Sequence, residues 1–597
     1  MSHARDTGRK ARPRPPFRPA RFDQSLCRQI LPDRHRFPHP GRDRTGPEAT
    51  MTEQGATGRI AIIGMGPRGL GALEALATRL HARPMPVQSV QPIQVDIFDP
   101  FTAPGAGPNF DPDESPLCQL NIPMRDIAIR PPEVSAIGPF ADWLPDAPDP
   151  DTFPARATLG RYLEARYADL HDRGALAITL QPHDIDHIAP DPTGWRLRAG
   201  DRWHGPYAEV LLVPGQPEVI PDDQLAEWQR HVRTGPAALA RAYPARRLQH
   251  RAADWTGRTV AIRGLALSAF DVLRVLTTGQ GGRFEDGGYI ASGREPARVL
   301  PFSLDGKPPS PKPATTELDA PFDPTPDETR AFTAAIAAAA TADPETAQHR
   351  ITAALLPALA RILRDTGGDA DGLSGWLAAE WSDPGSQETD GPLDHLQAGI
   401  AMAEGRIPPS IGYAVGQVWR KWQDELRGGF NPAPTAPETA SALVGFDEGL
   451  KRYSYGPPVS SSHELAALIK AGLVDLDLAT DPDIALIGGG WRLTTRAATA
   501  EASVMIDAVL PSPDLEAVRA PLVAGLVDEG RLSPLAGKLA AHTAPDGTLI
   551  GRDGAVSNGL CLLGRLALGS VIAADSLHDC FGEASDRWAG GVIDRMG

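Results

Sequence analysis

Two apolar stretches near residue 60 flank a short turn that is rich in glycine. Residues 60–63 form a mostly β-branched run of the kind found in buried parallel strands. After the turn, apolar residues return at helical spacing, at positions 70, 73, 76, 77 and 80. The pattern predicts a strand, a tight turn and a helix between residues 60 and 80.

The turn carries Gly64, Gly66 and Gly69 in the spacing GxGxxG. In a strand-turn-helix unit, the first glycine permits the turn, the second lets backbone approach a pyrophosphate, and the third lets helix and strand pack closely. The unpaired N–H groups at the start of the helix then face the phosphates. We interpret the segment as part of a dinucleotide-binding domain; the alternative is an ordinary βαβ unit with a glycine-rich turn.

A second strand is predicted over residues 93–98, where apolar and polar residues alternate. Asp99 stands at its carboxyl end, where a carboxylate can accept hydrogen bonds from ribose hydroxyls. Asp96 lies inside the strand and is the poorer candidate. The loop-like residues 81–92 account for a separation from Gly69 that exceeds the usual value of about twenty residues.

The strand-turn-helix pattern returns over residues 257–277. Gly264 keeps the first glycine of the motif, but Ala266 and Ala269 replace the second and third. Because a methyl group at Ala266 holds the backbone farther from a pyrophosphate, we expect weaker or differently posed binding. Ser268 is expected to cap the helix and to donate its hydroxyl to phosphate. A plain βαβ crossover is the alternative.

Two later strands are predicted to carry the chain between domains. A β hairpin near Trp195 leads into a strand at residues 210–213, which ends at Pro214 and Gly215. A similar strand near residues 504–510 would return the chain to the first domain. In proteins with two dinucleotide-binding domains, a strand end of this kind is where the chain passes the bound nucleotide, so Gly215 is a candidate for that place.

Between these strands lies a long stretch of different character. Residues 301–330 are rich in proline, which is typical of a linker or loop. Ala- and Leu-rich runs after them predict helices as far as about Leu426. We expect residues 303–450 to form a helical insertion, either a cover without chemistry or a lid over a substrate.

The carboxyl end, residues 558–589, has the pattern of an apolar strand, Gly564 and Arg565, a short loop and a helix. The helix is expected to begin near Ser570. Its first turn could stabilise anionic charge on a ligand. A terminal amphipathic helix packed on the sheet explains the same residues equally well.

Charge and composition exclude several classes of partner. The formal net charge of −16 argues against nucleic acid or an anionic membrane as the main partner. No run approaches the roughly 18 apolar residues of a membrane span. Four dispersed cysteines, with no CxxC pair and no histidine at metal spacing, indicate reduced thiols, a cytoplasmic setting and no metal site.

The first 50 residues differ from the rest, with twelve Lys and Arg against five Asp and Glu and no apolar periodicity. We expect them to form a disordered extension. An Arg-rich targeting arm and a start that belongs at Met51 are the alternatives.

Taken together, these motifs make the chain resemble the FAD/NAD(P)-binding family that includes aspartate N-monooxygenases (nitrosuccinate synthases) and a flavin-dependent urate hydroxylase. The resemblance covers most of residues 58–589. It rests on "IAIIGMGPRGLGALEAL", "VDIFDP", "PGAGPNFDPDESPLCQLNIP", "VPGQP", "GLALSAFDVLRVLT", "YIASGREP" and "GLCLLGRLALGSVIAADS".

The resemblance implies an α/β fold with two Rossmann-like dinucleotide-binding domains and a helical insertion in the second. The expected divisions are an extension at 1–50, the first part of an FAD-binding domain at 51–215, an NAD(P)H-binding domain at 216–515 and the C-terminal part of the FAD-binding domain at 516–597. FAD is expected at Gly64, Gly66, Gly69, Asp99, Asn121, Gly215, Gly564 and Arg565, with the "LNIP" segment near the flavin.

The nicotinamide coenzyme is expected at Gly264, Ser268 and Arg294. We expect NADPH ahead of NADH, because a guanidinium such as that of Arg294 can hold a 2′-phosphate bidentately. The "SLDG" sequence at residues 303–306 stands where the family has a basic pair, and Asp305 would repel that phosphate if it lies nearby.

The function implied is that of an FAD-dependent, NAD(P)H-consuming monooxygenase that uses O₂ on a small molecule, and the expected target is the amine nitrogen of an amino-acid-like substrate. Such chemistry comes from the cofactor more than from side chains, and no residue is singled out as catalytic. The alternative is an FAD-binding oxidoreductase or partner module without oxygenase turnover, which the degenerate second motif would explain.

Overall fold

The computed structural model describes residues 58–82, 92–129, 131, 135–537 and 539–596, all within one compact unit of the chain. The extension expected at residues 1–50 and most of the loop at 81–92 lie outside the described residues. The strand-turn-helix predicted between residues 60 and 80 is present as β1 (Arg59–Ile63) and α1 (Pro67–His81).

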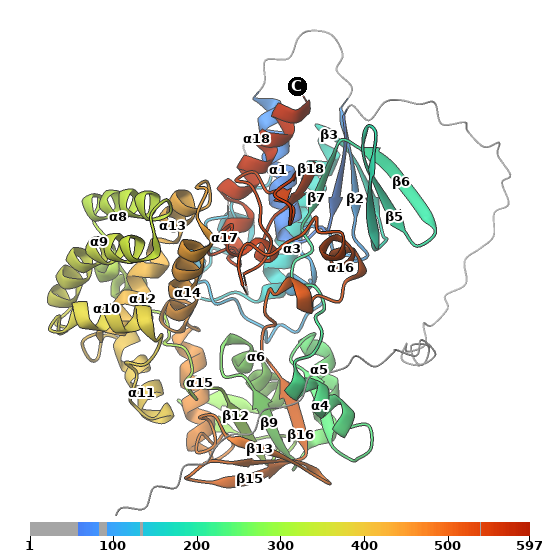
Figure 1. Ribbon diagram of the computed structural model, residues 1–597. Helices are drawn as coiled ribbons and strands as arrows, with labels where there is room; N and C mark the ends of the chain where they lie inside the picture. Colours follow the sequence, from blue (N-terminus) through green and yellow to red (C-terminus); the bar gives the residue numbers. More distant parts are fainter. Residues whose placement is uncertain (1–57, 83–91, 130, 132–134, 538, 597) are drawn as a thin grey trace, which may run out of the picture. The chain divides into compact units, whose positions relative to one another are not determined.

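The first sheet is six-stranded and mostly parallel (Figure 1). Its other strands are β2 (Ile93–Phe98), β3 (Leu176–Gln181), β7 (Glu209–Leu212), β17 (Thr548–Ile550) and β18 (Val556–Leu562). They lie in the order β17-β18-β7-β1-β2-β3, and only β17 and β18 pair in antiparallel fashion. Strands from both ends of the chain therefore build one sheet.

A second sheet contains four strands that are all parallel. They are β8 (Ala238–Arg241), β9 (Thr259–Arg263), β12 (Arg298–Phe302) and β16 (Val504–Asp507), in the order β12-β9-β16-β8. Helix α6 (Leu267–Leu276) follows β9 as α1 follows β1. The two parallel sheets, each with its own strand-turn-helix, confirm the expected α/β fold.

The two sheets follow a common plan. In the first, a three-stranded antiparallel sheet precedes β7, and in the second a similar one precedes β16. These small sheets are β4 (His187–Asp191), β5 (Gly194–Ala199) and β6 (Arg202–Tyr207), and β13 (Asp483–Ile487), β14 (Gly490–Thr494) and β15 (Thr499–Ala502). The hairpin predicted near Trp195 is thus present as β5 and β6, and a further hairpin consists of β10 (Arg283–Glu285) and β11 (Gly288–Ile290).

Alternating side chains of each central strand enter two different cores. Ile60 and Ile62 of β1 pack with helices, whereas Ala61 and Ile63 pack with the small sheet β4-β5-β6. Such alternation is the period-two pattern of a strand buried on both faces. The helices of this part are α1, α2 (Phe140–Trp143), α3 (Arg156–Asp172), α16 (Pro521–Asp528), α17 (Leu577–Cys580) and α18 (Glu583–Met596). In Figure 1, α18 lies beside α1.

The second sheet repeats this layering. Val260 and Ile262 of β9 pack with helices, whereas Ala261 packs with Trp491 of the small sheet β13-β14-β15. The helices of this part are α4 (Asp223–His231), α5 (Ala245–Ala252) and α6.

The predicted helical insertion is present but extends farther than expected, to Lys470. Its helices are α7 (Thr316–Asp319), α8 (Pro326–Ala339), α9 (Pro344–Asp365), α10 (Leu373–Ser382), α11 (Pro392–Ala403), α12 (Ile411–Lys421), α13 (Gln423–Phe430), α14 (Pro437–Ser454) and α15 (Val459–Lys470). The Pro-rich segment before them is not an exposed linker: Ser310 and Lys312 are buried, and their N–H groups donate to the carbonyls of Arg452 and Pro457. Composition alone does not reveal these backbone bonds.

Candidate functional site

Four of the residues expected at the FAD site lie at one edge of the first sheet. Gly64 follows β1, Asp99 follows β2, Gly215 follows β7 and Gly564 follows β18. Because β18, β7, β1 and β2 are neighbours and run parallel, their carboxyl ends meet at the same edge. Ligands of open α/β sheets bind at this edge.

The glycine-rich turn shows what each glycine is needed for. A Cβ at Gly64, whose φ is +99°, would collide with the carbonyl oxygen of Val213, and a Cβ at Gly69 would lie 2.6 Å from the carbonyl oxygen of Gly64. A Cβ at Gly66 would have only the Cα of Gly107 nearby, at 3.8 Å. The protein's own packing therefore requires Gly64 and Gly69, whereas the space beside Gly66 is free for a ligand. This arrangement fits a pyrophosphate.

Asp99 anchors this turn. Its Oδ2 accepts a hydrogen bond from the N–H of Met65 at 2.5 Å, and its Oδ1 accepts one from the N–H of Phe101 at 2.8 Å. Burial raises the pKa of Asp99, and these two hydrogen bonds oppose that rise. Since a carboxylate offers about four lone-pair sites, each oxygen keeps room for a ribose hydroxyl. Asp96 instead accepts hydrogen bonds from Arg59 and Tyr207 and serves the packing of the strand.

Arg565 joins two of the loops at the carboxyl edge. Its Nη1 donates to Oε1 of Gln216 at 3.1 Å, and Gln216 directly follows Gly215. The expectation of a helix near Ser570 is wrong, because the α-helix after this point is α17. Gly569 and Ala573 have φ values of +114° and +52°, which interrupt a right-handed helix. No helix start is thus available there to a ligand.

Arg68 is a residue of this region that the sequence analysis did not single out. It lies in the first turn of α1, and its side chain is only 10% exposed. The guanidinium donates to Oδ2 of Asp579 at 2.6 Å and to the carbonyl of Ala574 at 2.8 Å. A Cβ at Gly564 would lie 3.0 Å from its Nε. The only signal in the sequence is a charged residue between the second and third glycines of the motif.

In the second sheet, Gly264 occupies a place like that of Gly64. Its φ is +106°, and a Cβ there would lie 3.2 Å from the carbonyl of Ala508, just after β16. The expectation that Ser268 caps the helix is wrong: the N-cap of α6 is Ala266, and no side chain caps it. Ser268 is the second residue of the helix, close to Gly264 at the carboxyl edge.

The hydroxyl of Ser268 lies beside a polar cluster that connects α3, of the first sheet, with α6, of the second. It lies near Tyr243, whose own OH donates to Asp271 of α6 at 2.6 Å. Arg156 of α3 donates to the same phenol at 2.6 Å and forms an ion pair with Asp271.

Arg294 is not brought together with Gly264 and Ser268. Its carbonyl accepts a hydrogen bond from Thr256, and the next carbonyl, of Glu295, accepts one from the N–H of Gly257. Both donors precede β9, so Arg294 lies at the amino edge of the second sheet. Gly264 lies at the carboxyl edge, a strand of five residues away. The argument for NADPH that rested on Arg294 therefore fails.

Asn121 lies beside a buried ammonium group. Its carbonyl accepts a hydrogen bond from Nζ of Lys312 at 2.5 Å, and the carbonyl of Gly456 accepts another at 2.9 Å. Desolvation by burial lowers the pKa of Lys312 to about 7, and the nearby charge of Arg420 adds to this effect. Lys312 was missed because its Pro-rich surroundings resemble a linker.

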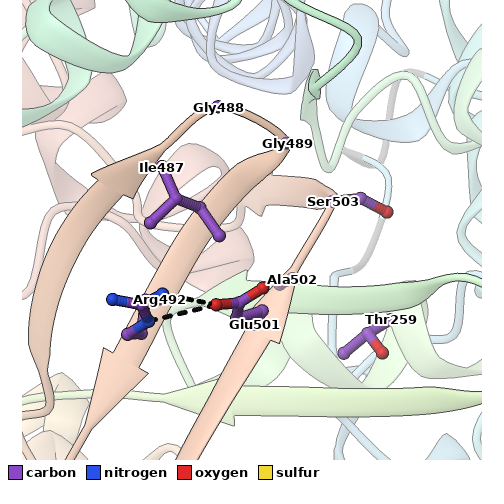
Figure 2. A pocket seen from close by; sticks show the side chains of 8 residues that line it. All are labelled: Thr259, Ile487, Gly488, Gly489, Arg492, Glu501, Ala502 and Ser503. Carbon is purple, nitrogen blue, oxygen red and sulfur yellow. Dashed lines mark hydrogen bonds and ion pairs between the residues drawn. The ribbon is translucent and has the colours of Figure 1, made fainter.

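Neither a metal cluster nor a surface cavity adds to the candidate cofactor site in the described part of the chain. No group of three or more His, Cys, Asp or Glu in that part of the chain could hold a metal ion. A surface cavity of about 370 Å³ lies at the amino edge of the second sheet (Figure 2), between Thr259 and the β13–β14 turn. Its charged side chains, Arg492 and Glu501, pair with each other at 2.7 Å. It is remote from the carboxyl edge and is not part of the candidate cofactor site.

Among the helices that the structure describes, none is both long and apolar enough to cross a bilayer.

A family model matches the part of the chain that contains the glycine-rich turn. Residues 61–217, which contain β1, the glycine-rich turn and β7, match the model of the family described as FAD-NAD(P)-binding.

Two curated relatives of the chain have named activities. The chain is 28% identical over 281 residues to the nitrosuccinic acid synthase npaA of Aspergillus oryzae, covering 43% of this chain and 42% of that protein. It is 27% identical over 299 residues to the nitrosuccinate-forming L-aspartate N-monooxygenase of Streptomyces davaonensis, covering 42% and 44%. The match thus spans less than half the length of these relatives. It confirms the resemblance to aspartate N-monooxygenases that the motifs indicate.

Among solved structures, an ornithine N-hydroxylase of Kutzneria sp. 744 aligns over 90% of this chain and 99% of its own, with 12% identity and a TM-score of 0.44. A lysine monooxygenase of Nocardia farcinica aligns over 89% and 99%, with 13% identity and a TM-score of 0.41.

Proposed function

We propose that this chain is an FAD-dependent monooxygenase that consumes NAD(P)H and O₂ and oxygenates the amine nitrogen of a small, amino-acid-like substrate. The observation that carries the proposal is the carboxyl edge of the first sheet, where Gly66 leaves open space at the start of α1 and Asp99 keeps free acceptor positions. The named activities of the two curated relatives support the choice of an amine nitrogen.

The chain's own residues would divide the work of holding the cofactors. The start of α1 would receive the pyrophosphate of FAD, and Asp99 would accept hydrogen bonds from its ribose. Arg565 and Gln216 would hold the loops after β18 and β7 in place beside it. Gly264 and Ser268 would receive the nicotinamide coenzyme at the second sheet. When bound, FAD supplies the redox and oxygen-activating chemistry.

Purified protein tests the proposal directly. We expect bound FAD, oxidation of NADPH or NADH, and O₂ uptake that an amine substrate stimulates. A screen of amino acids, other amines and purines identifies that substrate, with release of hydrogen peroxide as a measure of uncoupled turnover.

A second function, an FAD-binding module without turnover, is favoured by Ala266 and Ala269 in the second motif. Bound flavin that neither NADPH nor NADH bleaches under anaerobic conditions would support the module and contradict the monooxygenase.

A further inference from the structure

The loop after β12 occupies a position that decides coenzyme choice in dinucleotide-binding domains. β12 is the parallel neighbour of β9, with Phe302 opposite Arg263, so residues 303–307 lie at the same edge as Gly264. At the end of this second strand, an acid binds the 2′-hydroxyl of NAD, or an arginine accommodates the 2′-phosphate of NADP. The side chains there are therefore candidates for recognition of that group.

The structure brings a second set of charges to this loop from the helical insertion. A small cavity beside the loop, of about 20 Å³, is lined by Asp305, Lys307, Pro308, Gly385, Glu388, His395 and Arg452. It has room for about one water molecule. A phosphate would therefore bind at its mouth, where the side chains of Arg452 and Asp305 are 31% and 43% exposed.

Most of these polar groups already have close partners. Lys307 donates its Nζ to the carbonyl of Glu388, and His395 lies between the carbonyl of Pro308, at 3.1 Å, and the carboxylate of Glu388, at 3.4 Å. Oδ1 of Asp305 accepts hydrogen bonds from its own loop.

Arg452 differs, because its terminal nitrogens are held only loosely. Its Nε donates to the carbonyl of Gly449 at 3.1 Å, which fixes the stem. Its Nη1 lies 3.5 Å from Oδ2 of Asp305, beyond the 2.7–2.9 Å of a charge-assisted hydrogen bond. Among the described residues, no other hydrogen bond occupies these nitrogens. The guanidinium packs where a Cβ of Gly385 would stand, and Gly385 has a φ of +83°.

We propose that Arg452, a residue of the insertion helix α14, binds the 2′-phosphate of NADPH, and that Asp305 is its counter-ion when no coenzyme is bound. The inference rests on the proposed function, since it requires the second sheet to bind a nicotinamide coenzyme. Asp305 weakens the binding by repulsion, and Arg452 outweighs it because two parallel N–H groups can reach one phosphate.

The neighbouring residue offers a matched control. Lys451 is also a cation of α14, but its Nζ forms an ion pair with Asp575, at 2.7 Å, in the segment that follows β18. The two consecutive residues thus point to different sheets. A substitution of Lys451 removes one charge from the same helix, together with its ion pairs to Glu448 and Asp575, without touching the loop after β12.

The test measures binding of 2′,5′-ADP and of 5′-AMP to the FAD-containing protein by titration calorimetry. These probes differ in the 2′-phosphate alone. We expect the wild type to bind 2′,5′-ADP at least about tenfold more tightly than 5′-AMP, and Arg452→Gln to abolish this preference with the affinity for 5′-AMP unchanged. Lys451→Gln should keep the preference, and Asp305→Asn should increase it.

If Arg452→Gln keeps the preference for 2′,5′-ADP over 5′-AMP, the inference is wrong. The proposed function would remain intact in that case if NADPH still bleaches the flavin. Equal binding of the two probes by the wild type would also overturn the inference, and would assign Asp305 to the 2′-hydroxyl of NADH. If neither probe binds the wild type, both the inference and the nucleotide role of the second sheet are wrong.

Discussion

The guanidinium of Arg68 and the carboxylate of Asp579 form an ion pair with a nitrogen–oxygen distance of 2.6 Å, although 511 positions of the chain separate them. Arg68 stands in the glycine-rich turn, and Asp579 stands in α17 near the carboxyl end. The pair therefore holds the last segment of the chain against the start of α1.

We predict that Arg68→Met destabilises the protein by about 3 kcal/mol, because it leaves the carboxylate of Asp579, only 4% exposed, with the guanidinium of Arg427 at 4.0 Å as its remaining partner. Chemical denaturation measures the loss. The control is Arg173→Met, which breaks a more exposed pair with Asp169 and should cost at most about 1 kcal/mol. Equal losses in the two variants would show that the buried pair has no special part in stability.

The glycines of the first turn should respond differently to a methyl group. Gly66→Ala should fold with an unchanged melting temperature and lose flavin, since its Cβ would meet only Gly107 and its φ of −79° suits any residue. Gly69→Ala should lose about 1–3 kcal/mol of stability, because its Cβ would press on the carbonyl of Gly64. Flavin absorbance per protein and thermal unfolding separate the two effects. Full flavin content in Gly66→Ala would remove this residue from the cofactor site.

Lys312 should make stability depend on pH. Burial lowers its pKa in the folded protein from the ordinary 10.5 to about 7, so between these values the unfolded chain binds a proton that the folded protein does not. The free energy of unfolding should therefore rise from pH 7 toward pH 10, relative to that of Lys312→Met. Below pH 7 the ammonium is charged in both states, and the cost of burying it is fully present.

The comparison uses denaturation at pH 6 and pH 9.5, with Lys470→Met as a control at an exposed lysine. Lys312→Met also leaves the carbonyls of Asn121 and Gly456 without their donor, which shifts stability equally at both pH values. A pH dependence identical in the wild type and Lys312→Met would contradict the buried, deprotonating amine.

Arg294 should have no part in the choice of coenzyme. Because it lies at the amino edge of the second sheet, Arg294→Ala should change the Michaelis constants for NADPH and NADH by the same factor, if it changes them at all. A selective loss with NADPH, as the sequence motif alone predicts, would show that the coenzyme reaches the edge opposite Gly264.

The amino-acid sequence by itself determined the local units of this protein. Strand β1, the turn at Gly64 and helix α1 depend on apolar periodicity and on the backbone freedom of glycine, which are properties of neighbouring residues. The same holds for β9 and α6, and for Asp99, whose place at the end of β2 follows from the strand pattern. For this reason the α/β class and the residues at the carboxyl edge of the first sheet could be predicted.

Only the tertiary structure decided which distant residues meet. Arg294 and Gly264 lie only 30 positions apart in the sequence. The parallel direction of β9 and β12 nevertheless places them at opposite edges of the second sheet. No helix forms near Ser570, because residues with left-handed backbone conformations interrupt the segment. The segment packs instead on the core of the helical insertion. Arg68 with Asp579, Lys312 with Asn121 and Arg452 with Asp305 carry no local signal, because ion pairs and buried hydrogen bonds depend on distances in space.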